Sequence, residues 1–264
     1  MQLPPPLIDN IARGSVAVLL GAGASMEAKD SRGKRPPSGP ELGQMLASAF
    51  LDSSFDNAPL SQIAEYAISE NDLVTVQQFI VETLRPFSPG SAHDMLTRFQ
   101  WHGLATTNYD TLIETAYSRA KVPVQTVVPF ISDHDRIDRA SGSDGQVVLL
   151  KLHGCVTRHT DPALPFIITP DQFWEYKRGR THVFQQLCDW GREHSFVFLG
   201  QRLDDGNLRA VIRELDIAIP SRPRSYLVIP STSGVFSRFW EKQNVRVLPG
   251  TFSEFSTALQ TALP

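Results

Sequence analysis

Short apolar runs alternate with segments of helical periodicity along most of the chain. Runs that are nearly continuous in Val, Leu, Ile and Phe are typical of strands buried on both faces of a parallel sheet. Because helical segments lie between them, the pattern predicts a doubly wound, Rossmann-like α/β fold. The expected strands are Val16–Leu20, Gly103–Thr106, Val124–Val128, Val147–Leu152, Phe196–Leu199, Tyr226–Ile229 and Val245–Leu248.

The later part of the chain shows this alternation most regularly. Helices are expected over Asp205–Ala218, Val235–Lys242 and Phe252–Ala262, with one of the expected strands between each helix and the next. We therefore expect a single domain over residues 1–264.

A glycine-containing turn, Gly21-Ala22-Gly23-Ala24-Ser25, follows the first apolar run directly. A strand that opens into Gly-x-Gly can bring backbone N–H groups against a phosphate, because a side chain there would hold the ligand away. This turn predicts nucleotide binding, although the same glycines could serve only to reverse the chain. Polar residues at the ends of two later apolar runs, 105–110 and 149–154, favour the nucleotide interpretation.

The segment from Met26 to Trp101 differs from the rest because it contains no convincing strand. Apolar residues recur there at helical spacing, first over 60–68 and then over 73–84. A polar stretch rich in proline and glycine, 29–40, precedes them and predicts an exposed, flexible loop that can close over the glycine turn. We expect a helical insertion at about 26–101, placed after the first strand.

The insertion also argues against an ordinary nicotinamide dehydrogenase. In those enzymes the glycine fingerprint, a helix and a second strand follow one another within about 30 residues. Here Ser25 and Met26 stand in place of the third glycine, and the next clear strand begins near Gly103. Hydride transfer is therefore disfavoured.

Composition narrows the class of protein. The 264 residues are 41% hydrophobic and 20% charged, which is ordinary for a globular chain. A formal charge of −3 gives no electrostatic drive toward nucleic acid or an anionic membrane. The first residues lack the features of a signal peptide, and no apolar run approaches membrane-spanning length. We expect a cytoplasmic protein that binds neither nucleic acid nor a membrane directly.

The chain has only two cysteines, Cys155 and Cys188, and their separation fits neither a redox pair nor a disulfide framework. The histidines show no zinc-site spacing, so we predict no metal. Both cysteines are most simply small buried residues. A thiol nucleophile at Cys155, close to His153, is the alternative.

Three motifs together resemble those of the sirtuin superfamily in order and spacing. They are Gly21-Ala22-Gly23-Ala24-Ser25, Thr107-Asn108-Tyr109-Asp110 and Lys151-Leu152-His153-Gly154. The stretch from Phe198-Leu199-Gly200 to Leu208 also resembles the late glycine-containing turn of those domains, so the resemblance covers nearly the whole chain.

The resemblance implies NAD as the substrate and assigns a role to each motif. His153 would act as the base, since histidine titrates near neutral pH, and Asn108 would position the attacking water or the nicotinamide ribose. Asp110 would hold the nicotinamide carboxamide. The remaining predicted contacts to NAD are Gly21, Ala22, Gly23, Ser25, Thr107, Gly200 and Asp205. Taken singly, Asn108-x-Asp110 could instead be a helix cap and His153-Gly154 a simple turn.

Departures from the deacylase pattern refine the resemblance. The chain lacks the two cysteine pairs of the deacylase zinc module, and Thr107 stands where the second motif usually has glutamine. The closest resemblance is to zinc-free, sirtuin-like domains of bacterial anti-phage systems, which hydrolyse NAD. Gln201 and Arg202 replace the aromatic residue and the serine of their late turn, whereas Asp205 fits it.

The resemblance therefore implies an NAD+ hydrolase that releases nicotinamide and ADP-ribose as an abortive-infection effector. Such an enzyme must be held inactive until it is needed, which implies a regulatory partner, a fused sensor domain or oligomerisation. An NAD-dependent deacylase or ADP-ribosyltransferase is the alternative enzyme. A sensor that binds NAD or ADP-ribose without turnover is the alternative from another class.

Overall fold

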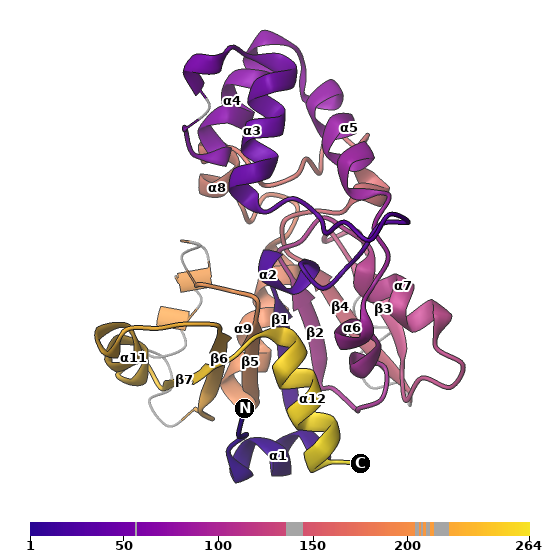
Figure 1. Ribbon diagram of the computed structural model, residues 1–264, viewed down its shortest axis with the longest axis vertical. Coiled ribbons are helices and arrows are strands. Elements are labelled where there is room, and N and C mark those ends of the chain that lie inside the picture. The colour runs from indigo at the N-terminus through magenta and orange to yellow at the C-terminus, as the bar shows by residue number, and fades with distance from the viewer. Residues whose placement is uncertain (56, 136–144, 204–205, 207, 210–211, 214–221) are drawn as a thin grey trace.

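The computed structural model describes residues 1–55, 57–135, 145–203, 206, 208–209, 212–213 and 222–264 (Figure 1). At its centre is a seven-stranded sheet in which all neighbouring strands are parallel. The predicted doubly wound α/β fold is confirmed. The strands are β1 (Val16–Leu20), β2 (Gly103–Thr106), β3 (Thr126–Phe130), β4 (Gln146–Lys151), β5 (Ser195–Leu199), β6 (Ser225–Ile229) and β7 (Val245–Pro249).

The strand order is β3-β4-β2-β1-β5-β6-β7. From β1 the chain builds the sheet on one side through β2, β3 and β4, and it then returns to place β5 on the other side of β1. The direction of winding therefore reverses between β1 and β5. In open α/β sheets, ligands bind beyond the carboxyl ends of the strands at such a switch point.

Helices cover both faces of the sheet and bury two apolar clusters. Alternate residues of β1 show the division, since Val16, Val18 and Leu20 enter one cluster while Ala17 and Leu19 enter the other. The first cluster is covered by α1 (Pro5–Ala12), α6 (Ser91–Leu96), α7 (Leu112–Arg119) and α12 (Phe252–Ala262), and the second by α9 (Thr181–Glu193) and α11 (Gly234–Glu241).

The predicted helical insertion is present. After the short α2 (Ala22–Ser25) come α3 (Gly39–Phe50), α4 (Leu60–Glu70) and α5 (Leu73–Leu84). These helices stand over the end of the sheet at which β1 runs into α2 (Figure 1). In the described part of 26–101 the only β pairing is a single bridge between Lys29 and Ser88.

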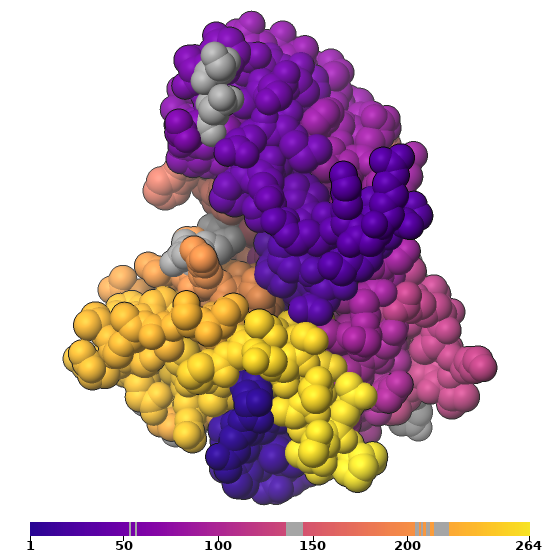
Figure 2. Space-filling view, in the orientation of Figure 1, coloured from indigo at the N-terminus to yellow at the C-terminus, as the bar shows by residue number. Residues whose placement is uncertain are grey.

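The insertion has its own apolar core. Residues of α3, α4 and α5 pack together there with Phe166 and Ile168, which come from the segment after β4. That segment also contains α8 (Pro170–Trp174), beside α4. Figure 2 shows the helical part standing above the sheet, with the surface indented on one side where the two meet.

The polar stretch that begins at residue 29 forms a mostly exposed loop, as predicted, but α3 already begins at Gly39. Hydrogen bonds within the loop hold its shape, and its flexibility stays a prediction. The Asp30 carboxylate accepts from the backbone N–H groups of Arg32 and Lys34, both at 2.8 Å. Arg35 donates two bonds of 2.7 Å to Glu41 in the first turn of α3. Closure of this loop over the glycine turn stays a prediction.

The strand that departs most from its predicted bounds is β3, which begins and ends two residues later than the apolar run that indicated it. The bounds of β4, β5, β6 and β7 differ from the prediction by one residue at one or both ends. Gln125, which precedes β3, bonds to the backbone of Trp101. Its side chain accepts from Trp101 N at 2.8 Å and donates to Trp101 O at 3.1 Å. Pairing with β4 starts only at Thr126, opposite Gln146. Pro129 is accommodated because β3 is an edge strand.

The helix expected over Asp205–Ala218 lies largely outside the described residues. Leu208 and Ile212, which are described, are buried in the apolar cluster beneath β5. None of the helices in the described parts of the chain is both long enough and apolar enough to cross a membrane.

His93, in the last helix of the insertion, packs edge to face against Phe252 of α12. It is buried in α6, where its Nδ1 accepts from Gly90 N at 3.3 Å. Burial lowers its pKa from 6.5 to about 4, and the carboxylates of Asp110 and Asp94 offset this only in part. A neutral imidazole therefore lies within the electrostatic reach of Asp110.

We expect the protein to lose stability as the pH falls from 6.5 toward 4. Over this range the unfolded chain protonates His93 while the folded chain keeps it neutral, at a cost of about 1.4 kcal/mol per pKa unit. Thermal melting between pH 7 and 4.5 measures the slope. His93→Gln, which keeps an acceptor for Gly90, should flatten it, and an unchanged slope would contradict the assignment.

Candidate active site

The strand register brings the sequence motifs to one edge of the sheet. Leu20 of β1 is aligned with Thr106 of β2 and Leu199 of β5, and Thr106 is aligned with Lys151 of β4. The glycine turn and the segments beginning at residues 107, 152 and 200 therefore leave the sheet at the same level. This is the carboxyl edge, below the helical insertion (Figure 1).

Asn108 is anchored by two hydrogen bonds to the glycine turn. Its Nδ2 donates to Gly21 O at 2.9 Å and to Ser25 Oγ at 2.8 Å. Because the Gly21 carbonyl can only accept, this contact fixes which end of the carboxamide is nitrogen. Both Nδ2 hydrogens are engaged, so Oδ1 is the atom with which Asn108 could accept a hydrogen bond from a water or a ribose hydroxyl.

Ser25 relays the chain of hydrogen bonds from Asn108 to Asp110. Its hydroxyl accepts from Asn108 and donates to Asp110 Oδ2 at 2.7 Å. The other Asp110 oxygen accepts from Leu112 N at 3.1 Å, at the start of α7. Neighbouring hydrogen bonds in such a chain polarise one another, so the three side chains behave as one unit. In the structure Ser25 therefore holds Asn108 and Asp110, and its contact to NAD stays a prediction.

His153 lies two residues beyond the end of β4 and is buried. Phe173 contacts its ring edge to face, with centroids 5.5 Å apart. Its backbone carbonyl accepts from Ile167 N at 3.0 Å. The residue before it, Leu152, donates its N–H to Thr106 O at 2.9 Å, which joins this segment to the strand end that carries Asn108.

Packing requires glycine in the first turn, for a reason that the sequence did not reveal. A Cβ on Gly23 would lie 2.8 Å from Gly200 Cα, and one on Gly200 would lie 2.1 Å from Ala24 N. Gly23 N also donates to Gly200 O at 2.9 Å. The two glycine turns therefore pack backbone against backbone at the switch point, independently of any phosphate. Ala22 begins the short helix α2, which forms most of the first turn.

Gln201 occupies the space beside Gly21. Its Nε2 donates to Thr107 Oγ1 at 2.9 Å, and a Cβ on Gly21 would lie 2.4 Å from its Cδ. The sequence marked Thr107 and Gln201 as separate departures from the sirtuin pattern, and the structure joins them in one hydrogen bond. Asp205, the last predicted contact to NAD, lies outside the described residues.

Sequence reasoning missed a buried arginine behind the His153–Gly154 turn. Arg180 is 2% exposed, and its Nη2 donates to Pro165 O at 2.7 Å. Its Nε has no hydrogen-bond partner within the described part of the chain. Burial lowers its pKa, which Asp133 opposes. No pattern in the sequence could have indicated it, because the residue follows a polar loop.

Both cysteines are buried and neither is part of a disulfide bond, as their spacing suggested. Cys155 Sγ accepts from Thr157 Oγ1 at 3.3 Å. Over the described residues, no three His, Cys, Asp or Glu side chains gather as metal ligands would.

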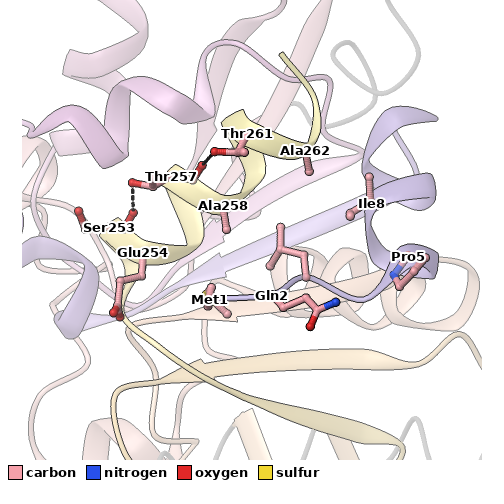
Figure 3. A pocket seen from close by; sticks show the side chains of 11 residues that line it. Met1, Gln2, Pro5, Ile8, Ser253, Glu254, Thr257, Ala258, Thr261 and Ala262 are labelled. Carbon is pink, nitrogen blue, oxygen red and sulfur yellow. Dashed lines mark hydrogen bonds between the residues drawn. The ribbon is translucent and has the colours of Figure 1, made fainter.

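A groove of about 650 Å³ lies elsewhere, between the N-terminal segment and α12 (Figure 3). Its lining includes Met1, Ile8 and Ala258 and none of the predicted site residues. The Thr257 and Thr261 hydroxyls donate to carbonyls of their own helix. The groove therefore lacks the convergent polar groups of a typical ligand site.

The sheet and its switch point define a Rossmann-like α/β protein, and the polar residues at the carboxyl edge are its candidate ligand site. The model of the SIR2-like domain family matches residues 102–248, more than half of the 264 residues, and the chain belongs to that family. The match contains Asn108, His153 and Gly200, and it associates the protein with NAD. No curated protein sequence matches the chain significantly.

Proposed function

We propose that this protein is an NAD+ glycohydrolase that cleaves NAD to nicotinamide and ADP-ribose. The observation that carries the proposal is the anchored Asn108, whose carboxamide is held by Gly21 and Ser25 at the sheet edge that also bears His153. Family membership supports NAD as the ligand.

The proposed reaction breaks the bond between the ribose C1′ and the nicotinamide nitrogen. The bonding electron pair leaves with nicotinamide, and positive charge develops on the ribose, as in other glycosidic cleavages. Water then bonds to C1′ through its oxygen and releases a proton. Asn108 Oδ1 orients the water or the neighbouring ribose hydroxyl, and His153 accepts the proton.

Asp110 would recognise the leaving group in this scheme. Its carboxylate can accept a hydrogen bond from the nicotinamide NH₂ while Ser25 and Leu112 hold it in place. Gly21, Ala22, Gly23, Thr107, Gly200 and Asp205 would line the side that takes the ribose and diphosphate.

We further propose that the enzyme is an effector of a bacterial anti-phage system. Uncontrolled NAD hydrolysis would harm the cell that makes it, so a regulatory partner, a fused sensor domain or assembly into an oligomer would keep it inactive. The sequence lacks the two cysteine pairs of the deacylase zinc module, which supports this assignment over a deacylase.

Analysis of the products tests the proposed function. The protein is incubated with NAD, and the products are separated by chromatography. ADP-ribose and nicotinamide without any acceptor would support hydrolysis. O-acyl-ADP-ribose formed from an acylated peptide would instead indicate a deacylase, a modified protein an ADP-ribosyltransferase, and binding without products a sensor.

Ser25→Ala should lower kcat for NAD by about 10- to 100-fold, because a hydrogen bond to a charged group contributes about 1.5–3 kcal/mol. The variant removes the acceptor for Asn108 and the donor to Asp110. Ser15→Ala is the matched control, since Ser15 contacts His194 at the amino edge of the sheet. Equal kcat values for the two variants would show that Ser25 does not position Asn108.

A further inference from the structure

Lys151, the last residue of β4, is a fully buried lysine beneath the candidate site. Its side chain is 1% exposed. Transfer of an ammonium group out of water is costly unless hydrogen bonds and opposite charge compensate for it. The partners of Lys151 therefore matter for its role.

The ammonium contacts two groups of the segment that follows β2. Its Nζ donates to the backbone carbonyl of Asp110 and pairs with Glu114 Oε1 at 3.3 Å. Burial alone would lower the pKa of Lys151, but Glu114, Cys155 and Asp110 outweigh it, and the pKa is raised. The side chain is charged at neutral pH.

These contacts join the two segments that carry the proposed chemistry. Lys151 lies two residues before His153, and the carbonyl it holds belongs to the turn of Asn108 and Asp110. The turn has other anchors as well: Asn108 bonds to Gly21 and Ser25, and the Asp110 carboxylate bonds to Ser25 and Leu112. Tyr109, between them, bonds to Ile167 O and Val156 N. The bond from Lys151 is the one that holds the backbone carbonyl of Asp110 itself.

We propose that Lys151 is a positioning residue that sets the place of Asp110, and through it the recognition of the nicotinamide carboxamide. The inference rests on the proposed function for the role of Asp110. Lys151 itself touches neither NAD nor the reacting atoms, and it acts through the carbonyl that it holds.

The ion pair could instead serve only to stabilise the fold, and the two roles are separable. One oxygen of Glu114, Oε2, is buried without a hydrogen-bond partner in the described part of the structure. Replacing both members of a buried ion pair by apolar residues is often neutral or stabilising, whereas removing one member leaves an uncompensated charge. The double variant Lys151→Met/Glu114→Leu therefore removes the anchor of the turn without leaving a lone charge.

The experiment compares the double variant with the wild type by thermal melting and by hydrogen exchange of amides 107–112. It also compares NAD with its carboxylate analogue, nicotinic acid adenine dinucleotide, as substrates. We expect near-wild-type melting, exchange at 107–112 faster by about 10-fold, and a preference for NAD weaker by about 10-fold, because one hydrogen bond is lost. The analogue is informative because its carboxylate would repel Asp110.

Arg119→Met is the matched control. It removes a 2.6 Å ion pair with Asp94 at the other end of α7, away from the turn. Exchange at 107–112 should not change in this variant. If the double variant shows wild-type exchange in the turn, the pair is only structural and the proposal is wrong. The exchange measurement decides this even if the wild type does not cleave NAD, so the two proposals fail separately.

Discussion

Asn108→Ala and His153→Ala are each expected to lose NAD turnover by about 10²- to 10⁴-fold, the usual effect of removing a positioned acid–base group or its partner. Both residues lie in segments beyond strand ends, outside the helices and strands. NAD binding and the melting temperature should therefore remain close to those of the wild type. Initial rates test the loss of turnover, under conditions in which the wild type consumes NAD. Calorimetry tests whether NAD binding and the melting temperature are retained.

Cys155→Ala is the control for the alternative chemistry. The thiol is buried beyond β4, close to His153 in the sequence, so a thiol mechanism would lose activity in this variant while our proposal expects turnover to persist. If His153→Ala consumes NAD as fast as an activated wild type, His153 is not the base and the site lies elsewhere.

Gly200→Ala is expected to destabilise the fold by about 2–5 kcal/mol, the sum of left-handed strain and overpacking. Gly200 has φ +64, and an added Cβ would lie 2.1 Å from Ala24 N. Because Ala24 N is a backbone atom, relief of this clash requires the chain itself to move. The clash would also separate the two glycine turns, so NAD binding should weaken. Urea unfolding gives the free energy of unfolding.

Gly33→Ala separates the two contributions to that loss. Gly33 also has a left-handed backbone, with φ +78, but nothing lies within 4 Å of its added Cβ. This variant should lose only the strain of about 1–2 kcal/mol. Equal losses at Gly33 and Gly200 would mean that the close approach of the two turns adds nothing to stability.

The packing of Gly23 on Gly200 changes how a substitution at Gly23 is interpreted. The sequence predicted that a side chain there would hold a phosphate away. The structure adds that a Cβ would meet Gly200 Cα at 2.8 Å, so loss of NAD binding in Gly23→Val could follow from a displaced turn. Measurements of binding by such variants need a stability measurement beside them.

The central strands were predictable because burial on both faces leaves a local record in the sequence. Near-continuous apolar runs marked all seven strands, and helical spacing marked the insertion. The start of β3 was not predictable. It depends on Gln125 bonding to the backbone of Trp101, a contact 24 residues distant that no local pattern records.

The candidate site was predictable as a set of motifs but not as a set of contacts. Asn108 and Asp110 stand out because they follow an apolar run, and parallel strands bring such ends to one edge. Their linkage through Ser25 spans 83 and 85 residues of sequence. Lys151 gave a weak signal, as a charge that ends an apolar strand, whereas Arg180 gave none.

The sequence by itself determined the α/β class, the helical insertion and the sirtuin-type motifs, because each depends on residue types at short, regular spacing. Only the tertiary structure decided that Gly23 packs on Gly200, that Gln201 reaches Thr107 and that Lys151 holds the Asp110 carbonyl. These contacts join residues that are distant in the chain. The fold fixes their positions through strand order and register, which local periodicity does not record.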